Sequence, residues 1–368
     1  MIQYENIFKV FRTTYARTFD TETQQSSINK VKPKLSFFIK DPTNKTKYKS
    51  ALTKEYLKEV TFNTEKEYTD SIKMYKDSDV AIYGNRSLEH CYIRENFINP
   101  LESNHDFHNW YLDIETMVDL NDPEHDKRLD WKAMGSSRSA KAIISSIQIY
   151  DSKSKEYYIF GLNKEWKNHS NYKSEYGKIK YFNAPTEELM LKGFLKLLKK
   201  RNPTLVVGFN SFGYDFPYIT NRIIRVLDKR EDLYVQDKEN NWKFNTDCLK
   251  GSFVKQLSPV GVITHKAKEN KFGGIDDSFE WLGIFLEDYA VLIEKYAKEP
   301  LPDNTLNTIA THWLGEGKVN HDVFDDFGAW YRGDYEHYIY DKKTPDTELD
   351  LLYLKLMELD KEIKNRGL

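Results

Sequence analysis

The sequence is poor in three features that define large classes of proteins: cysteines, long apolar runs and net charge. Its 368 residues include two cysteines, Cys91 and Cys248, too few for a disulfide framework or a four-ligand zinc site, so we expect a reducing compartment. No apolar run approaches the roughly 18 residues of a membrane span, and the N-terminus lacks the pattern of a secretory signal. The length and the 39% of hydrophobic residues instead predict two or three folded domains.

The net charge of -2 conceals two segments of opposite charge. Residues 30–59 carry nine lysines against three acids, whereas residues 319–350 carry nine acids against three basic residues. The basic segment contains KVKPKLSFFIK, which either binds phosphates and stacks bases or forms the solvated face of a strand whose Leu35, Phe37 and Ile39 point inward. The small net charge therefore does not exclude a nucleic-acid partner.

Hydrophobic patterning divides the chain near residue 105. Residues 1–105 predict a smaller α+β domain, with strands at LSFFI and VAIYG around a helix at TEKEYTDSIKMYKD. Residues 106–350 predict a larger domain with three consecutive strands, NWYLDIE, AIISSIQIY and EYYIFGL. A helix capped by Thr186, the strand TLVVGFN and a helix through Tyr218 follow. This order predicts an RNase H-like α/β domain, a mixed sheet flanked by helices.

Three further segments follow recognisable patterns. Residues 260–286 alternate around a glycine-containing tip, which predicts a long β-hairpin. TLNTIATHWLG predicts a helix that stops at Gly315. Residues 351–368 continue a leucine-rich C-terminal helix, and residues 118–139 form a charged insertion.

The strand NWYLDIE ends in two acids that can act together. Asp113 and Glu115 lie two residues apart, so a strand places both carboxylates on one face. Adjacent carboxylates repel each other unless a cation lies between them, and oxygen ligands without a His/Cys cluster favour Mg²⁺ or Mn²⁺ over zinc. Taken alone, the pair is more simply explained as two solvated acids at a strand end.

A third acid, Asp215, follows the apolar strand in GFNSFGYDFPYITNR. It lies beside Pro217 at the start of a predicted helix, so it either stabilises the helix N-terminus or joins the first two carboxylates. Gly208 and Gly213 allow the backbone to turn closely around a substrate or simply form a turn. Asn210 in the same loop donates either to a phosphate or to the loop itself.

A fourth acid is expected at the start of the C-terminal helix. We favour Asp346, because Thr344 and Pro345 form a typical N-cap and first turn before an apolar helix face; Asp341 is the alternative. Four acids on three elements would bind two metal ions about 3.5–4 Å apart, lower the pKa of an attacking water and stabilise charge on a phosphate. The set therefore predicts phosphodiester hydrolysis.

These segments resemble the three exonuclease motifs of family B DNA polymerases, most closely the replicative polymerases of T-even-like phages. The motifs are WYLDIET, GFNSFGYDFPYITNR and the acidic C-terminal helix. KPKLSFFI, LKEVTF, VAIYGN and YIRENF also resemble the N-terminal domain of those polymerases, and the hairpin and following helices keep their order. The resemblance covers nearly the whole chain.

The resemblance implies a two-metal 3'→5' proofreading exonuclease acting on single-stranded DNA 3' ends in the cytoplasm of a phage-infected bacterium. The implied ligands of two Mg²⁺ or Mn²⁺ ions are Asp113, Glu115, Asp215 and Asp346. Asn210 and Phe212 would face the 3' end, and the 260–286 hairpin would help to separate the primer end from its template.

The third motif departs from the family pattern. The family has a tyrosine four residues before the last aspartate, where it orients the attacking water, but Lys342 occupies this position relative to Asp346. We expect Tyr340 to take this role. If Asp341 is the ligand instead, His337 occupies the position.

A second departure is the end of the chain at Leu368, shortly after the third motif and without an Asp-Thr-Asp-Ser-type palm motif. We therefore expect no DNA synthesis by this chain alone. It would be a fragment of a family B polymerase or a subunit that works with a palm, fingers and thumb chain in trans. The alternative function is a catalytically degenerate nucleic-acid-binding or scaffold module of a replication complex, which the retention of all four acids opposes.

Overall fold

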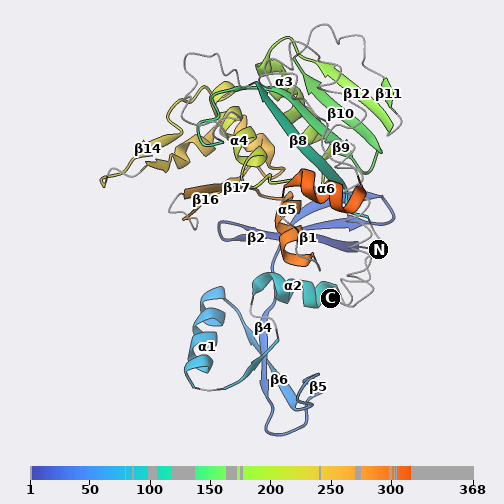
Figure 1. Ribbon diagram of the computed structural model, residues 1–368. Helices are drawn as coiled ribbons and strands as arrows, with labels where there is room; N and C mark the ends of the chain where they lie inside the picture. The colour runs from blue at the N-terminus through green and yellow to red at the C-terminus, as the bar shows by residue number, and fades with distance from the viewer. Residues whose placement is uncertain are drawn as a thin grey trace. The chain divides into compact units, whose positions relative to one another are not determined.

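The computed structural model divides the chain into two units, Met1–Asp106 and Phe107–Leu368 (Figure 1). The described residues are 2–78, 80–84, 87–97, 106–117, 137–162, 172–174, 177–239, 242–269, 275–297, 301, 303 and 305–315. Outside them lie Asp346, Asp341, Tyr340, the helix predicted to continue through 351–368 and most of the 118–139 insertion. Within the described ranges, no helix has the length and apolar character needed to cross a membrane.

The first unit contains two antiparallel sheets, with strand orders β1-β2-β3 and β5-β6-β4-β7. The strands are β1 Ile2–Val10, β2 Thr13–Asp20, β3 Gln25–Val31, β4 Leu35–Lys40, β5 Tyr48–Lys49, β6 Tyr56–Phe62 and β7 Ile82–Tyr83. The sequence did not reveal the first sheet, because its strands are rich in polar residues and contain no continuous apolar run.

Two helices complete the first unit, α1 Glu65–Asp77 and α2 Leu88–Asn96. Thr64 begins α1 as an N-cap, accepting a hydrogen bond at 3.2 Å from the backbone N–H of Glu67. Phe37 of β4 is fully buried in a core with Tyr68 of α1 and Cys91 of α2. The predicted helix and the inward direction of Phe37 are confirmed.

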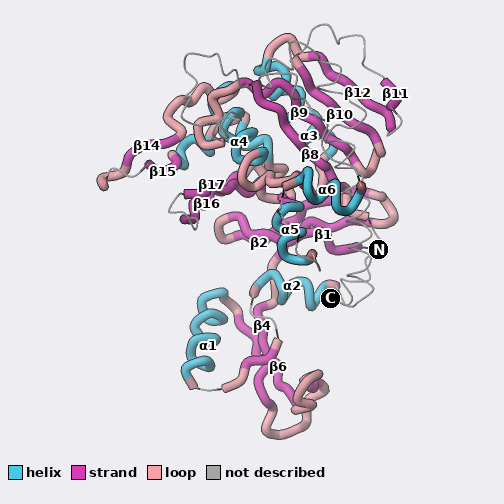
Figure 2. The backbone as a smooth tube through the Cα atoms, in the orientation of Figure 1, coloured by secondary structure: helices cyan, strands magenta, loops and turns pink. Residues whose placement is uncertain are grey.

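A seven-stranded mixed sheet forms the centre of the second unit, in the order β11-β12-β10-β9-β8-β13-β18. Figure 2 labels its strands β8 to β12. β8, β9 and β10 are antiparallel neighbours, whereas β13 and β18 run parallel to β8. The strands are β8 Asn109–Met117, β9 Ile143–Asp151, β10 Glu156–Gly161, β11 Tyr172–Ser174, β12 Gly177–Asn183, β13 Leu205–Gly208 and β18 Phe285–Asp288. The predicted RNase H-like fold class is confirmed, but the predicted strand order lacked β11, β12 and β18.

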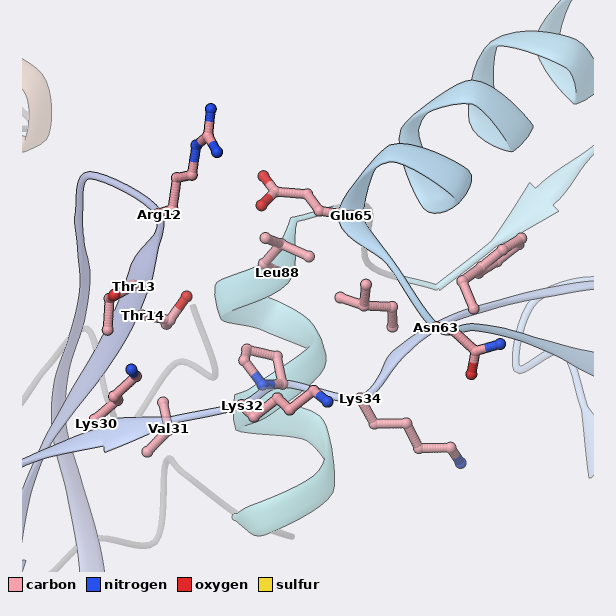
Figure 3. Close-up of a pocket in the computed structure, with 13 residues that line it drawn as sticks. Arg12, Thr13, Thr14, Lys30, Val31, Lys32, Lys34, Asn63, Glu65 and Leu88 are labelled. Carbon is pink, nitrogen blue, oxygen red and sulfur yellow. The ribbon is translucent and has the colours of Figure 1, made fainter.

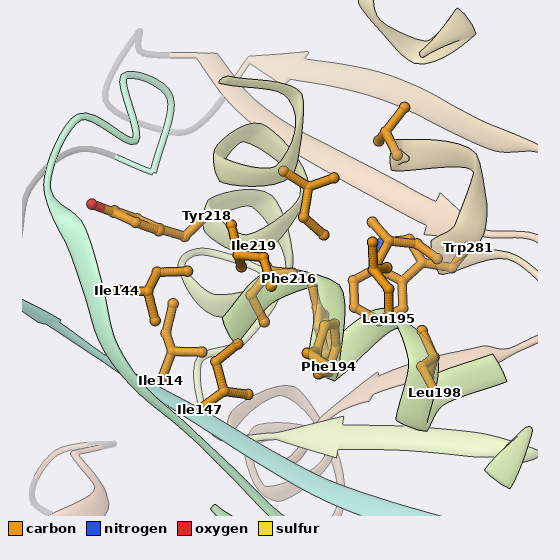
Figure 4. Close-up of a cluster of buried hydrophobic side chains, with 14 of the residues drawn as sticks. Ile114, Ile144, Ile147, Phe194, Leu195, Leu198, Phe216, Tyr218, Ile219 and Trp281 are labelled. Atoms are coloured by element: carbon orange, nitrogen blue, oxygen red, sulfur yellow. The ribbon is translucent and has the colours of Figure 1, made fainter. Parts of the chain in front are cut away.

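Helices cover both faces of this sheet. They are α3 Glu187–Arg201, α4 Asp215–Val226, α5 Tyr289–Tyr296 and α6 Leu306–Leu314. Residues of α3 and α4 share a core with Leu112 and Ile114 of β8 (Figure 4). Residues of α5 and α6 pack with Tyr111 instead. Alternate residues of a strand point to opposite faces, so the two helix pairs lie on opposite sides of β8.

The predicted helix boundaries follow from caps. The side chain of Thr186 accepts from the N–H of Leu189 at 3.3 Å and begins α3. Gly315 ends α6 with a φ of +76°, a left-handed conformation that favours glycine.

Two hairpins and two short 3₁₀ helices complete the described part. They are β14 Tyr234–Gln236 with β15 Trp242–Phe244, β16 Ile263–Glu269 with β17 Ile275–Trp281, and the 3₁₀ segments Thr246–Lys250 and Val254–Leu257. The predicted hairpin at 260–286 is therefore confirmed, with shorter strands and a tip that lies outside the described residues.

Candidate active site

The first two candidate acids lie on β8, an interior strand of the sheet between β9 and β13. Asp113 and Glu115 are half-buried, and Ile114 between them is buried, so the two acids share a face as the spacing predicts. β13 pairs with β8 only over residues 109–111. The acids therefore lie just beyond the end of the parallel pairing, where the neighbouring chain leaves the sheet.

The third candidate acid lies at the first residue of α4. Asp215 is only 3% exposed. Burial raises the pKa of its carboxyl well above the ordinary value, and the charges of Asp113 and Glu115 raise it further. Backbone hydrogen bonds from its own N–H and from Ile114 act in the opposite direction. The fold thus brings three carboxylates from β8 and α4 within electrostatic reach of one another.

The loop between β13 and α4 approaches β8 so closely that a side chain does not fit at Gly208. A Cβ there would lie 2.8 Å from the carbonyl oxygen of Leu112 and 2.8 Å from the Cβ of Ser211. Asn210 follows with a φ of +57°, so the backbone reverses sharply before the helix. The glycine that sequence analysis associated with close approach therefore lets the loop pack beside the strand that carries Asp113.

A residue outside all three motifs holds this loop in place. The carboxylate of Asp288 accepts backbone hydrogen bonds from Asn210 at 2.8 Å, Phe212 at 2.9 Å and Ala290 at 2.9 Å. Asp288 ends β18, lies opposite Gly208 in the parallel pairing and is 2% exposed. Sequence reasoning missed it. An acid directly before a helix suggests an N-cap, but nothing local links it to a loop 76 to 78 positions away.

The two predicted DNA-contacting residues differ in exposure. The side chain of Asn210 is exposed, whereas Phe212 is half-buried. The backbone N–H of Asn210, rather than its side chain, donates the hydrogen bond to Asp288 that holds the loop. The exposed side chain of Asn210 is therefore not needed for this hydrogen bond.

Tyr214 is a second residue that the sequence did not single out. Its hydroxyl lies 2.9 Å from the Oγ1 of Thr116, the residue after Glu115. Burial raises the pKa of Tyr214, and the charges of Asp215 and Glu115 add to this effect. The phenol therefore stays neutral beside the acids and links the start of α4 to β8.

The carboxylates suit a hard divalent cation by their chemistry. Asp215 is buried beside two other negative charges, and oxygen ligands are those that Mg²⁺ and Mn²⁺ prefer. Among the described residues, no three His, Cys, Asp or Glu side chains are arranged so that they could hold a metal ion by themselves. Asp346, the predicted fourth ligand, and Tyr340 lie outside this part of the chain.

A family model for the exonuclease domain of family B DNA polymerases matches residues 71–264, more than half of the chain. The chain belongs to this family. The match covers both segments of the candidate site, β8 with Asp113 and Glu115 and the loop leading to Asp215 in α4. It ends before Asp288, the residue that organises the loop.

Individual relatives of this family B exonuclease domain are distant. The DNA-directed DNA polymerase of Enterobacteria phage T4 is 26% identical over 145 residues, 39% of this chain and 14% of that polymerase. The corresponding enzyme of Escherichia phage RB69 is 25% identical over 201 residues, 50% of this chain and 20% of that polymerase. The DNA polymerase delta catalytic subunit of Candida albicans is 29% identical over 150 residues, which cover 39% of this chain and 12% of that subunit. The aligned part is thus a fifth or less of each relative.

Proposed function

We propose that this chain is a 3'→5' exonuclease that removes nucleotides from single-stranded DNA ends, in the proofreading role of a family B polymerase. One observation carries the proposal. Asp215 is buried at the start of α4, and the negative charges of Asp113 and Glu115 on β8 raise the pKa of its carboxyl further. Burying a carboxylate beside two others is unfavourable unless a cation offsets the charge. Such an arrangement is typical of a functional site.

The residues that would hold two Mg²⁺ or Mn²⁺ ions are Asp113, Glu115, Asp215 and Asp346. When bound, such ions would lower the pKa of the attacking water and stabilise the negative charge that develops on the phosphate. Tyr340 would orient the water. The remaining residues keep the carboxylates in position, because Gly208 allows the loop to approach β8 and Tyr214 links α4 to the strand.

Two features of the loop before α4 favour a single-stranded substrate. Its backbone is anchored by Asp288, so the exposed amide of Asn210 is presented beside the acids without first having to be ordered. Phe212 offers a half-buried ring on which a terminal base would pack. The β16–β17 hairpin would help to keep the primer end apart from its template.

We further propose that the exonuclease works with the palm, fingers and thumb of a family B polymerase, on the same chain or in trans. The cytoplasm of a phage-infected bacterium is the proposed location. Cys91 and Cys248 are both buried thiols outside any disulfide, which suits a reducing compartment.

The test is cleavage of a 5'-labelled single-stranded oligonucleotide with Mg²⁺ or Mn²⁺. The Asp113→Ala/Glu115→Ala variant should lose at least about 100-fold in rate, because loss of outer-shell partners alone typically costs 10–100-fold. The matched control Glu239→Ala/Asp247→Ala removes two exposed acids of the same unit and should cleave like the wild type.

Metal binding gives an independent readout. The melting temperature of the wild type should rise with Mn²⁺ by mass action, by an amount equivalent to about 2.7 kcal/mol at 100 times the Kd. The double variant should not respond. Equal cleavage by the wild type and the double variant would contradict the assignment, and a wild type indifferent to Mn²⁺ would indicate a scaffold instead.

A further inference from the structure

A cavity in the first unit has a cationic rim formed by Arg12, Lys30, Lys32 and Lys34 (Figure 3). Its lysines belong to the basic segment at residues 30–59, for which phosphate binding is already one interpretation. The strongest new signal lies in the second unit instead. It is a buried ion pair that contacts the strands beside the proposed acids.

Glu187 and Arg222 form this ion pair between two helices. Glu187 is the first residue of α3, and Arg222 lies in α4. Arg222 Nε lies 2.7 Å from Glu187 Oε1, and Arg222 Nη2 lies 2.6 Å from Glu187 Oε2. The side chains are 11% exposed for Arg222 and 9% exposed for Glu187. Pairing at two points fixes the orientation of the two groups as well as their distance.

Four successive backbone carbonyls, those of residues 139–142, accept hydrogen bonds from side chains of α4. Arg222 Nη1 donates to the carbonyl oxygens of Ala140 at 3.0 Å and Lys141 at 2.7 Å. The other two donors of the helix are Arg225 Nε, 2.6 Å from the carbonyl of Ser139, and the hydroxyl of Tyr218, 2.8 Å from that of Ala142. The segment that leads into β9 is thus held by α4.

The other partner of the pair, Glu187, contacts β9 directly. Its Oε1 accepts the backbone N–H of Ile144 at 2.8 Å. The register between β8 and β9 shifts between Glu115 and Thr116, around Ser145, the additional residue of a β-bulge. Ser145 Oγ donates to the carbonyl oxygen of Glu115 at 3.0 Å. Bulges redirect nearby side chains, and the side chain at this bulge is that of a proposed metal ligand.

The ion pair therefore joins the supports of two proposed acids. Asp215 begins α4, and Arg222 lies about two turns later on the same face of the helix. Glu115 lies at the bulge, where Glu187 holds the backbone of Ile144. Figure 4 shows Ile144 in the core that α4 shares with the sheet.

We propose that Glu187 and Arg222 are positioning residues of the exonuclease, which set the carboxylate of Glu115 relative to that of Asp215. This role rests on the proposed function, because the relative position of the carboxylates matters only if they share metal ions. Groups that bind a metal together must be held to within about 0.5 Å of the productive geometry. An ion pair that links the bulge to α4 supplies such a constraint.

A pair that only stabilises the fold is the competing explanation. Asp151 and Arg201 provide the comparison, because Asp151 is also buried and accepts from Arg201 Nε at 2.8 Å. Asp151 lies opposite Trp110, near the start of β8 and away from the bulge. Loss of that pair should destabilise the unit without displacing Glu115.

The test compares Glu187→Gln and Arg222→Lys with the matched control Arg201→Lys, each below its own melting temperature. Glutamine keeps one acceptor oxygen but loses the charge, whereas lysine keeps the charge but loses the two-point geometry. Mn²⁺ affinity without DNA is measured from the EPR signal of the free ion. It should fall about 10–100-fold in both variants, the usual effect of losing a partner that orients metal ligands. Arg201→Lys should bind Mn²⁺ like the wild type.

Cleavage of a 5'-labelled single-stranded oligonucleotide at saturating Mn²⁺ gives the second readout. In both variants kcat should fall about 10–100-fold, whereas KM should stay near the wild-type value because the loop before α4 is unaltered. The double variant should lose no more than the more impaired single variant, since both residues act through one ion pair. Losses that multiply would assign the residues separate roles and overturn the proposal.

Two further outcomes would overturn the positioning role alone. One is wild-type Mn²⁺ affinity and kcat in Glu187→Gln and Arg222→Lys, and either variant decides this if the other does not fold. The other is an equal loss in Arg201→Lys, because general destabilisation would then explain the effect. A wild type that neither binds Mn²⁺ nor cleaves DNA would instead refute the proposed function, and the positioning role with it.

Discussion

The backbone N–H of Asn210 donates a hydrogen bond to the carboxylate of Asp288, 2.8 Å away, across 78 positions of the sequence. The same carboxylate accepts from Phe212 at 2.9 Å. The buried carboxylate of Asp288 on β18 thus holds the backbone of the loop that carries the proposed DNA contacts. Through Gly208, the same loop packs against the strand of the proposed catalytic acids.

Substitution Asp288→Asn should destabilise the second unit by about 1–3 kcal/mol, because an amide has one acceptor oxygen and leaves a buried N–H unsatisfied. Urea unfolding measures this loss. In the cleavage assay, KM for single-stranded DNA should rise more than kcat falls, since the loop is displaced while the acids remain. The control Asp303→Asn alters an exposed acid that accepts from a single backbone N–H, that of Thr305, and should have a smaller effect. Equal effects of the two variants would contradict this role.

Substitution Asp215→Asn should abolish cleavage yet raise the melting temperature in EDTA at pH 7. Its folded pKa is raised by burial and by neighbouring acids, so ionisation at neutral pH opposes folding, and the neutral amide removes this penalty. Each kcal/mol relieved corresponds to about 2–4 °C for domains of 150–250 residues. The advantage should shrink as the pH falls toward the ordinary carboxyl range. A variant less stable than the wild type in EDTA would show that the carboxylate is already compensated.

Asp151 should make the fold sensitive to acid. Burial raises the pKa of its carboxyl, but hydrogen bonds from His108 and Arg201 outweigh this and lower it overall. Asp151 also accepts from Trp110 Nε1 at 2.8 Å and from Arg201 Nε at 2.8 Å. Because the pKa of Asp151 is lower in the folded than in the unfolded state, its ionisation stabilises the fold at pH values above the unfolded pKa of about 3.9. This stabilisation is lost as the pH falls below about 3.9 toward the folded pKa.

The variant Asp151→Asn should therefore lose about 3 kcal/mol at pH 7, because it breaks a buried ion pair. Its stability should depend less on pH between about 5 and 3 than that of the wild type. Thermal melts across this range measure both effects. The exposed Glu239→Gln variant should follow the wild type; a parallel pH profile for Asp151→Asn would refute the prediction.

Gly208→Ala should destabilise by about 1–3 kcal/mol, the usual cost of overpacking. The added Cβ would meet the backbone oxygen of Leu112 at 2.8 Å, which cannot move without shifting the strand that carries Asp113. Cleavage should therefore fall along with the melting temperature. Gly193→Ala is the control, because its closest neighbour is a ring carbon of Phe160 at 3.1 Å and alanine favours its helix. Similar losses at both glycines would argue against a special role for Gly208.

Most of the second unit could be predicted because its determinants are local. The alternation around Ile114 places Asp113 and Glu115 on one face of the strand. Thr186 begins α3 because its hydroxyl accepts a hydrogen bond from the backbone N–H three residues later. Gly315 ends α6 for an equally local reason. By contrast, β11 and the sheet of β1 to β3 carry no strong apolar period, and pairing with neighbours decided their form.

The sequence by itself determined which residues we propose for the chemistry: two acids two residues apart on an apolar strand and a third acid at a helix start. The tertiary structure decided their surroundings. The parallel pairing of β18 with β13 brings Asp288 to the loop before α4. Burial in the folded protein, together with the charges of Asp113 and Glu115, raises the pKa of Asp215. Solvation and long-range pairing depend on which segments meet in space, so no local pattern contains them.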